Sequence, residues 1–405
     1  MGPKEVDIVN VHAKQEMLPF PHKYAENRIA RKRFFSNRNM SSDTTLWPLA
    51  PHTVGKHKVL AAYLKAWLPI LGLTSQRILF IDGFSGPGQY SGGEEGSPII
   101  ALRTFLEHTA REKFKAKVGF IFIDGHEDRI NHLKWLVEKD WKAKVPKERC
   151  SISIEHGRFD DTLTTALDEL EANRKKMAPA LVMIDPFGVS DTPMEVIGRI
   201  LANRKAEVYV SFMYEAINRF KSSPEFEKHL DSLFGCPEWR QGISIDDPTE
   251  RKNFFYSLYE MQLKNAGAEH VVHFDLYEGN RLVYAIFFAT KHQKGSDRMK
   301  EAIWSIDPFG NFAFRGTKSP QLTLGLKFNN FEPLKVLLKE HFKGREWVPI
   351  EEVLEYVASD QTDFYTGQVK APVLKPMEKN GEIEVDPKSR KRRLTYPPGT
   401  RLRFL

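Results

Sequence analysis

A carboxylate and a glycine-rich turn follow an apolar stretch in the first quarter of the sequence. Residues 77–82 have the length and composition of a strand, they end in Asp82, and glycines at 86 and 88 complete a D-x-x-x-G-x-G pattern. In an open α/β sheet, ligands bind beyond the carboxyl ends of the strands, and glycines let the backbone approach the ligand. The sequence therefore predicts a ligand site here, although a plain glycine turn between two elements would have the same composition.

Two more strand-like stretches are followed by carboxylates that could bind parts of a nucleotide-like ligand. Asp124 closes residues 118–124, where an acidic residue would accept hydrogen bonds from ribose hydroxyls. Glu127 is a rival for that role, but an acidic residue there would also stabilise the start of a helix. Past the next stretch, Asp160 or Asp161 could accept a hydrogen bond from an adenine amino group. An N-cap role is equally plausible for this pair.

The fourth strand-like stretch ends in Asp185-Pro186-Phe187-Gly188. Proline fixes the backbone there, so we expect the Asp185 carboxylate to lie in the crevice and face the substrate. In methyltransferases that act on amino groups, a related D/N/S-P-P-aromatic motif orients the target nitrogen. Phe187 stands where the second proline would be and Gly188 where the aromatic residue would be, which puts amino-group methylation in doubt. Phe187 joins Asp185 as a candidate catalytic residue, although such a phenylalanine is more often part of a core.

The elements that must position these side chains form an alternating pattern. Apolar runs of strand length alternate with helical spacing, which is typical of βαβ units and a parallel sheet. The predicted strands are 77–82, 118–124, 150–155, 180–185 and 207–213, with a closing hairpin at 270–277 and 282–290, and the predicted helices are 57–71, 98–112, 129–138, 163–174 and 193–203. The sequence therefore predicts an α/β fold with a Rossmann-like, doubly wound, mostly parallel sheet.

The pattern changes near the C-terminal end of the sequence. Residues 331–341, 350–357 and 364–380 have helical spacing, and 381–385 and 393–396 resemble two short strands, which together outline a small winged-helix domain. We therefore divide the chain into an irregular polar arm at 1–45, a Rossmann-like domain at 46–328 and a winged-helix-like domain at 329–405.

Basic residues are concentrated in that last domain. The net charge is +7, and residues 388–405 contain seven Lys and Arg and no acidic residue. Since a wing would contact phosphates, which supply affinity without reading sequence, DNA or RNA is a candidate partner. A solvated, charged tail is the alternative. The candidate nucleic-acid contacts are Lys388, Arg390, Lys391, Arg392 and Arg393.

Composition limits the remaining possibilities. Hydrophobic residues make up 41% and charged residues 28%, as in soluble globular proteins. The apolar run at 282–289 is far shorter than the roughly 20 residues that a membrane helix needs, and the first residues lack the pattern of a signal peptide. Two cysteines suit a reducing compartment. We expect a cytoplasmic protein that does not bind membranes.

The glycine turn resembles the first motif of class I S-adenosylmethionine (SAM) methyltransferases, where the carboxylate helps to hold the amino acid part of the ligand. More specifically, the order of residues 46–56, 63–67, 81–98 and 184–188 resembles the three-Cys-motif partner proteins. This resemblance implies a bacterial methyltransferase-like domain that acts with a separately encoded, radical-SAM-type protein bearing a three-cysteine motif. It implies SAM as the cofactor, and the residues expected to bind it are Asp82, Gly83, Phe84, Gly86, Gly88, Asp124 and Asp160.

The glycine loop departs from an ordinary methyltransferase. Residues 89–96 intervene before the next helix, so Asp82 and Asp124 are 42 residues apart, where a nucleotide fold usually has about 20. We expect this insertion to be a mobile lid, with a plain solvated loop as the alternative. His52 and Lys56 could line the same crevice, but a lone histidine near a helix start is more often a cap or a surface residue.

Three functions fit these observations. The first is a SAM-dependent methyltransferase, which needs alignment more than a conspicuous base. The second is a catalytically inactive scaffold for the three-cysteine partner. The third is a metal-dependent phosphoryl transferase or nuclease, because Asp82, Asp124 and Asp185 all end predicted parallel strands and could converge on Mg²⁺. This third function leaves the glycine loop without a role.

Overall fold

A single eight-stranded sheet organises most of the molecule. The structure is a computed structural model of the 405-residue chain and describes residues 45–307, 313–314 and 331–405. The strand order is β3-β2-β1-β4-β5-β7-β6-β8, and only β7 runs antiparallel to its neighbours among the described strands. The strands are β1 (Arg77–Asp82), β2 (Lys117–Asp124), β3 (Cys150–His156), β4 (Ala180–Ile184), β5 (Ala206–Phe212), β6 (His270–Glu278), β7 (Arg281–Thr290) and β8 (Ala313–Phe314).

Helices cover both faces of this sheet, and the alternation of strand side chains explains why. Ile78 and Phe80 of β1 pack into a core with α1, α2, α3 and α9, whereas Leu79 and Ile81 pack into a second core with α4, α5, α7 and α8. A parallel sheet buried on both faces needs nearly continuous apolar strands, and β4 is buried at every residue. The helices are α1 (Pro51–Gly72), α2 (Ser97–Leu106), α3 (Glu127–Asp140), α4 (Phe159–Ala172), α5 (Met194–Leu201), α6 (Tyr214–Phe220), α7 (Glu227–Phe234), α8 (Pro248–Asn265) and α9 (Gln293–Ile306).

The predicted α/β fold class and the doubly wound, mostly parallel sheet are confirmed. Each predicted strand of the main sheet agrees with an observed strand to within one or two residues at each end. The sequence analysis did not predict α6, α7 and α8, which fill the connection between β5 and β6, or α9. No helix among the described residues combines the length and the apolar character that crossing a membrane requires.

The C-terminal residues form a separate layer of helices and a small sheet. A three-stranded antiparallel sheet has the order β10-β11-β9, and it packs with three helices. The predicted helix at 364–380 is instead a 3₁₀ turn, a π-turn (Lys370–Leu374) and the short α13. The elements are α11 (Glu332–Phe342), β9 (Val348–Pro349), α12 (Ile350–Ala358), α13 (Lys375–Lys379), β10 (Ile383–Val385) and β11 (Arg401–Phe404).

The predicted strand at 393–396 is wrong. The partner of β10 is β11, several residues later, and Val385 pairs with Leu402. Leu394 has a left-handed φ of 59°, which ends an extended conformation, and Pro397 and Pro398 lack the N–H that a strand ladder needs. Residues 386–400 therefore form one long connection between β10 and β11. The winged-helix assignment stays a prediction, and the predicted limits at 1–45 and 328 adjoin or lie within segments outside the described residues.

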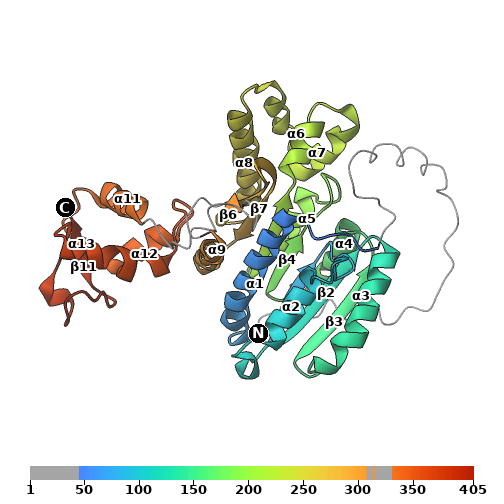
Figure 1. Cartoon of the computed structure of the whole chain (residues 1–405), viewed down its shortest axis with the longest axis horizontal. Coiled ribbons are helices and arrows are strands. Elements are labelled where there is room, and N and C mark those ends of the chain that lie inside the picture. The colour runs from blue at the N-terminus through green and yellow to red at the C-terminus, as the bar shows by residue number, and fades with distance from the viewer. Residues whose placement is uncertain (1–44, 308–312, 315–330) are drawn as a thin grey trace.

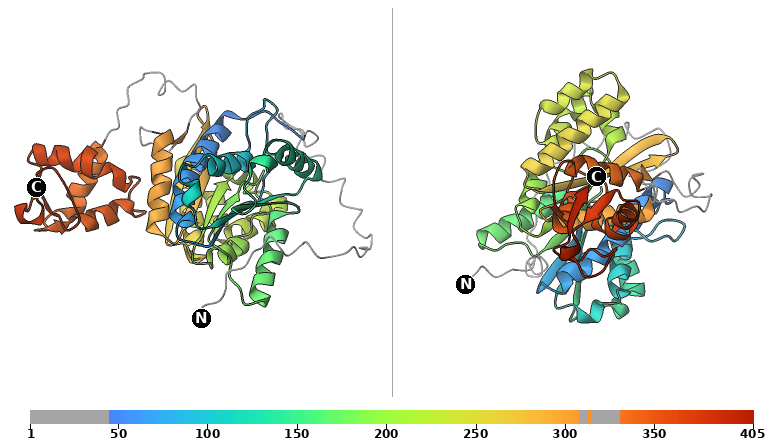
Figure 2. Two further views of the ribbon diagram at one scale, coloured as in Figure 1. Left: turned by 90° about the horizontal axis from the view of Figure 1, so that it is seen from below. Right: turned by 90° about the vertical axis from the view of Figure 1, so that its left-hand side faces the viewer.

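Helix α9 joins the C-terminal elements to the main sheet (Figures 1 and 2). The ammonium group of Lys300, on α9, is buried and donates to the carbonyl oxygens of Val357 at 2.6 Å, Ser359 at 2.8 Å and Thr362 at 3.0 Å. All three N–H donors of the ammonium are thus bonded to carbonyl oxygens of one short segment, residues 357–362. This joint holds the end of α12 firmly against α9.

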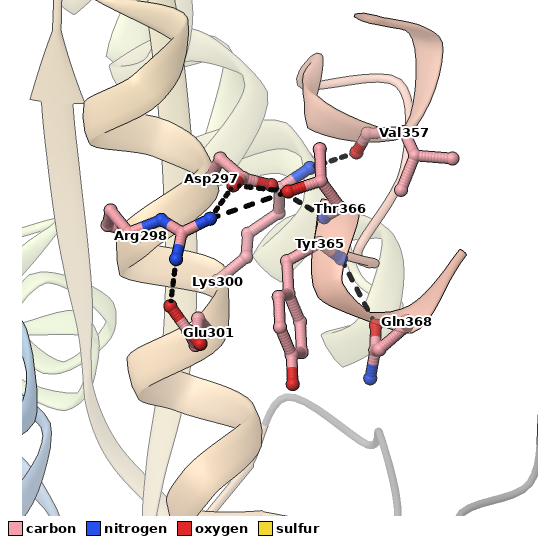
Figure 3. A network of polar contacts seen from close by, with 8 residues as sticks. All are labelled: Asp297, Arg298, Lys300, Glu301, Val357, Tyr365, Thr366 and Gln368. Carbon is pink, nitrogen blue, oxygen red and sulfur yellow. Dashed lines mark hydrogen bonds and ion pairs between the residues drawn. The ribbon is translucent and has the colours of Figure 1, made fainter. Parts of the chain in front are cut away.

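A second set of contacts extends the joint along α9 (Figure 3). The Asp297 carboxylate accepts from the Thr366 amide at 2.7 Å and from its hydroxyl at 2.8 Å. The indole of Trp304 stacks on Phe364 with ring centroids 5.4 Å apart, and its N–H donates to the Asp363 carbonyl at 2.7 Å. One apolar core runs without a break from α1 to Phe404. The C-terminal elements are therefore packed onto the sheet domain rather than tethered to it.

Candidate functional site

The strand order reverses between β1 and β4, and the candidate site lies at this switch point. In open α/β sheets the crevice beyond the carboxyl ends of the strands at such a point binds the ligand. Asp82 is the last residue of β1 and pairs in register with Met183 of β4. Asp185 follows β4 directly. The two carboxylates that the sequence places after separate strands are therefore brought to the carboxyl ends of two neighbouring strands, where such a crevice is expected.

Asp82 is fully buried, and one of its oxygens has no partner. Oδ1 accepts the Phe84 amide N–H at 3.2 Å, while Oδ2 has no hydrogen-bond partner among the described residues. Burial raises the pKa of Asp82 to about 7, an effect that the Ser97 hydroxyl nearby and the Phe84 amide only partly offset. A buried, unsatisfied carboxylate oxygen is costly, and a ligand ammonium group would satisfy it. Asp82 thus fits the amino group of an amino acid moiety.

The glycine loop has the backbone that its sequence suggests. Gly86 and Gly88 have left-handed φ values of 61° and 79°, a region that side chains other than glycine rarely adopt. A Cβ on Gly88 would lie 2.5 Å from a methyl carbon of Leu133, and one on Gly83 would lie 2.3 Å from the Phe159 ring. Gly83 is therefore required by packing beneath the loop. The Phe84 ring contributes to the same packing, with its centroid 5.6 Å from that of Phe159.

Asp124 is used to build the loop. Its Oδ2 accepts the Gly86 amide at 3.0 Å and its Oδ1 accepts the His126 amide at 2.8 Å. The Arg129 guanidinium lies 3.8 Å from Oδ2. Asp124 thus lies beside the glycine loop with both oxygens engaged by the protein itself, and its predicted role in ribose binding stays a prediction. Its rival Glu127 is exposed at the start of α3, as the helix-dipole interpretation requires.

Asp160 is held by an arginine that the sequence analysis did not single out. Both of its oxygens accept from Arg158, at 3.2 and 2.8 Å. Arg158 also pairs with Asp161 at 3.3 Å and with Asp191, in the loop after β4, at 2.5 Å. Asp160 lies in the first turn of α4. The arrangement ties the β3–α4 turn to the loop that follows β4.

A partly buried ion pair joins Asp185 to the buried Lys56 of α1. Burial alone would lower the pKa of Lys56, but the charge of Asp185 outweighs that effect and raises it. The Lys56 carbonyl accepts the Tyr209 hydroxyl at 3.1 Å, which fixes this turn of α1 over the sheet. The sequence offered Lys56 as a residue that could line the crevice, and the structure places it there.

Neighbouring aromatic and histidine side chains enclose the pair. Lys56 Nζ is 5.6 Å from the Tyr284 ring centroid, and His52 packs edge-on against that ring at 5.5 Å. Burial, followed by the charge of Lys56, lowers the pKa of His57 to about 3. The Tyr90 hydroxyl lies 3.5 Å from His57 Nε2. The imidazole of His57 is therefore a neutral hydrogen-bonding group at physiological pH.

An aromatic rim borders the crevice. The Arg129 guanidinium lies 4.9 Å from the Trp47 ring and 4.8 Å from the Phe187 ring, and Trp47 also packs against Tyr90. Phe187 is 51% exposed, so it is not a core residue. The sequence analysis missed Arg129 and Tyr90. The four side chains of this rim come from four separate segments of the chain, and the sequence gives no signal that they meet.

The insertion at 89–96 is a small hairpin. Gln89 and Glu95 form an antiparallel bridge, the Tyr90 amide donates to the Glu94 carbonyl at 2.8 Å, and the Ser91 amide donates to the Trp47 carbonyl at 3.0 Å. Glu95 also pairs with Arg103 of α2. The base of the hairpin is thus anchored, and residues 91–94 are exposed. Its action as a lid stays a prediction.

The three aspartates do not form a metal site in the described part of the chain. No group of three or more His, Cys, Asp and Glu side chains among the described residues has the spacing to hold a metal ion. Asp185 has the Lys56 ammonium where a cation would bind, and Asp124 is satisfied by backbone amides. This geometry gives the phosphoryl-transferase hypothesis no support.

Strand order and switch point define the class of fold. The order 3-2-1-4-5 is that of nucleotide-binding Rossmann sheets, and the antiparallel β7 between β5 and β6 gives the methyltransferase type of that sheet. The chain therefore has a Rossmann-like, class I methyltransferase-like fold. No protein-family model and no curated protein matches the sequence.

Solved structures are similar to this chain at low identity. The SAM complex of Trm1 from Pyrococcus horikoshii is 14% identical, with a TM-score of 0.36, over 65% of this chain and 61% of Trm1. LPL1258 from Legionella pneumophila is 12% identical, with a TM-score of 0.34, over 60% of this chain and 85% of its own. The METTL16 methyltransferase domain is 11% identical, with a TM-score of 0.31, over 60% and 69%. The chain thus spans less than two thirds of Trm1.

Proposed function

We propose that this protein is a SAM-dependent methyltransferase. The observation that carries the proposal is the buried Oδ2 of Asp82, which has no partner among the described residues and lies at the switch point beside the glycine loop. A carboxylate there would pair with the ammonium group of SAM. Gly86 and Gly88 leave the backbone open to the rest of that amino acid moiety.

The chemistry then depends mainly on alignment. When bound, SAM supplies an electrophilic methyl group, and a nucleophile held in line with it gains most of its rate from positioning. Asp185 faces the same crevice and is oriented by Lys56. Its carboxylate would accept a hydrogen bond from the acceptor group and so fix the direction of the acceptor's lone pair. The exposed Phe187 ring would lie beside the acceptor.

A calorimetric titration with SAM and S-adenosylhomocysteine tests the proposal. Wild-type protein should bind SAM, and Asp82→Asn should weaken binding by roughly 100-fold, because a charged hydrogen bond to a buried carboxylate is worth about 1.5–3 kcal/mol. Glu207→Gln is the matched control. Glu207 is also fully buried in the sheet, with a pKa that burial raises to about 7, but it contacts Tyr63 and Thr290 away from the crevice. Equal SAM affinity in wild type and Asp82→Asn would reject the proposed site.

Two partners belong to the same proposal. By resemblance, the protein acts with a three-cysteine-motif, radical-SAM-type protein in the cytoplasm. The connection between β10 and β11 would bind DNA or RNA phosphates through the exposed side chains of Lys388, Lys391, Arg392 and Arg393. Arg390 is not available for this role, since its guanidinium forms a buried pair with Glu378.

A catalytically inactive, SAM-binding scaffold is the second candidate. The departure of Asp185-Pro186-Phe187-Gly188 from the amino-methyltransferase motif favours it, as does the engagement of Asp185 by Lys56. Incubation with SAM labelled in its methyl group, in the presence of nucleic acid and the three-cysteine partner, separates the two. Label transfer supports the enzyme, whereas SAM binding without transfer to any component supports the scaffold.

A further inference from the structure

An apolar groove lies at the edge of the main sheet, away from the switch point. It has a volume of about 740 Å³ and is bounded by α3, the turn after it and β3. Ile152 and Ile154 of β3 line its floor, and Trp135 of α3, which is 52% exposed, forms one wall. Solvent-exposed apolar surface of this kind on a folded protein commonly marks an interaction site.

The floor of the groove is also an unpaired strand edge. β3 is the terminal strand of the sheet and pairs only with β2 among the described strands. The Val118 amide donates to the Arg149 carbonyl at one end of this ladder, and the Gly157 amide donates to the Asp124 carbonyl at the other. In a regular parallel ladder these bonds turn the odd-numbered residues of β3 toward β2. The amides and carbonyls of Ile152 and Ile154 therefore point outward.

This edge has little of the usual protection against pairing. Exposed edge strands are normally protected by charged residues, above all lysine, by proline or by a bulge, whereas β3 contains no proline, lysine or arginine, has Glu155 as its single acidic residue, and keeps its register with β2 throughout. Seven residues of regular strand, with side chains of Ile152 and Ile154 on the groove side, make a template for one more strand. Such strand addition takes its affinity from main-chain bonds and its specificity from pockets for alternate side chains.

The charges around the groove indicate the partner's character. Lys134, Lys142 and Lys147 line it together with a single acidic residue, Glu138, which pairs with Lys142. Lys139 adds a further ammonium group over the Trp135 ring. A second copy of this chain would bring the same lysines against one another. An acidic segment would be attracted to them.

We propose that β3 binds an extended segment of a partner protein as an additional strand of the sheet, a segment in which apolar residues alternate with uncharged polar ones and acidic residues flank this run. The apolar side chains enter the groove over Ile152, Ile154 and Trp135. The acidic side chains reach the lysines at its rim. This docking site does not depend on methyl transfer, so it can be tested separately from the proposed enzyme activity.

The test uses the full chain and a short labelled peptide in which valine and threonine alternate between terminal glutamates. Fluorescence anisotropy should show binding, and the same peptide with terminal lysines in place of the glutamates should not bind. The charge reversal Lys134→Glu with Lys147→Glu should raise the Kd by roughly tenfold or more. Lys228→Glu, an exposed lysine on α7 outside the groove, should leave the Kd unchanged.

Amide hydrogen exchange measured by NMR separates strand addition from simple groove binding. On binding, the amides of Ile152 and Ile154 should gain protection, whereas those of Ser151 and Ser153 already face β2. Ile152→Pro removes an outward donor without removing an inner ladder bond, so it should fold and lose most of the affinity. Failure of the acidic peptide to bind, binding without protection at Ile152 and Ile154, or dimerisation of the chain through β3 would each overturn the proposal.

Discussion

The two carboxylates expected to hold the ligand differ in the atoms they leave free. Asp82 keeps one buried oxygen without a described partner, whereas both oxygens of Asp124 accept backbone amides of the protein. Asp124 therefore shapes the loop that surrounds the ligand, and Asp82 is the group that a ligand cation would neutralise. The difference could not be predicted from the sequence, because both residues end strands in the same way.

The raised pKa of Asp82 predicts a pH-dependent affinity for SAM. With a pKa of about 7 in the free protein, Asp82 is mostly protonated below that pH and must release its proton before it pairs with an ammonium group. Affinity should therefore fall about tenfold per pH unit below 7 and level off above it. Calorimetry between pH 5.5 and 8.5 would show this slope in wild type and its absence in Asp82→Asn. A flat wild-type profile would contradict the assignment.

At the scale of elements, the parallel strands were predictable and the long connections were not. β1, β2 and β4 are continuous apolar runs, and the rule that their carboxyl ends meet at one edge was enough to bring Asp82 and Asp185 together. The helices α6 and α7 are short and mix polar with apolar residues, so no period stands out. Arg129 meets Trp47 and Phe187 only because three separate segments converge. Such convergence is a property of tertiary packing.

The connection between β10 and β11 contains arginines with two different environments. The side chain of Arg390 is 9% exposed and makes two bonds to Glu378, at 2.7 and 2.6 Å, whereas Arg392 and Arg393 are exposed. A row of basic residues in the sequence does not reveal this distinction. Arg390 stabilises the connection. Arg393 Nε also lies 3.6 Å from Glu378, but its side chain is 78% exposed, so Arg392 and Arg393 remain accessible to phosphates.

Substitutions in this connection should separate binding from stability. Arg392→Ala with Arg393→Ala should weaken nucleic-acid binding and reduce the slope of log K against log salt by about 2 for duplex DNA, with an unchanged Tm. Arg390→Ala should instead lower stability by about 1–3 kcal/mol, since Glu378 loses a hydrogen-bonded partner. Anisotropy across a salt series and thermal melts measure the two effects. An unchanged slope in the double variant would show that Arg392 and Arg393 do not contact phosphates.

At the scale of the whole molecule, the contacts on α9 couple the C-terminal elements to the main sheet, so we expect the two to unfold as one cooperative unit. Lys300 satisfies three carbonyls of the C-terminal segment, and the apolar core continues across the contact. Figure 3 shows the bond from Lys300 to Val357 and the bonds between Asp297 and Thr366. Most interfaces between domains of one chain are small and polar, and they permit relative motion. This one combines a buried cation with stacked rings.

Loss of the buried ammonium should uncouple the two groups. Lys300→Met leaves three carbonyls without their donor, at a cost of about 1–3 kcal/mol for each one that stays buried. Calorimetry should show a single unfolding transition for wild type and two for the variant. Lys294→Met, at an exposed position of the same helix, should keep the single transition. Two transitions already present in wild type would show that the joint does not couple them.

The joint also has a geometric consequence for any polymer that binds the connection between β10 and β11. Because α9 packs directly on the main sheet, the basic loop and the crevice at β1 and β4 are separated by rigid structure with no flexible tether in the described contact. If the proposed phosphate contacts hold a strand that is also the methyl acceptor, the modified nucleotide would lie at a fixed distance along that strand from the bound phosphates. The target would then be selected by its position along the strand as well as by the chemistry of the acceptor.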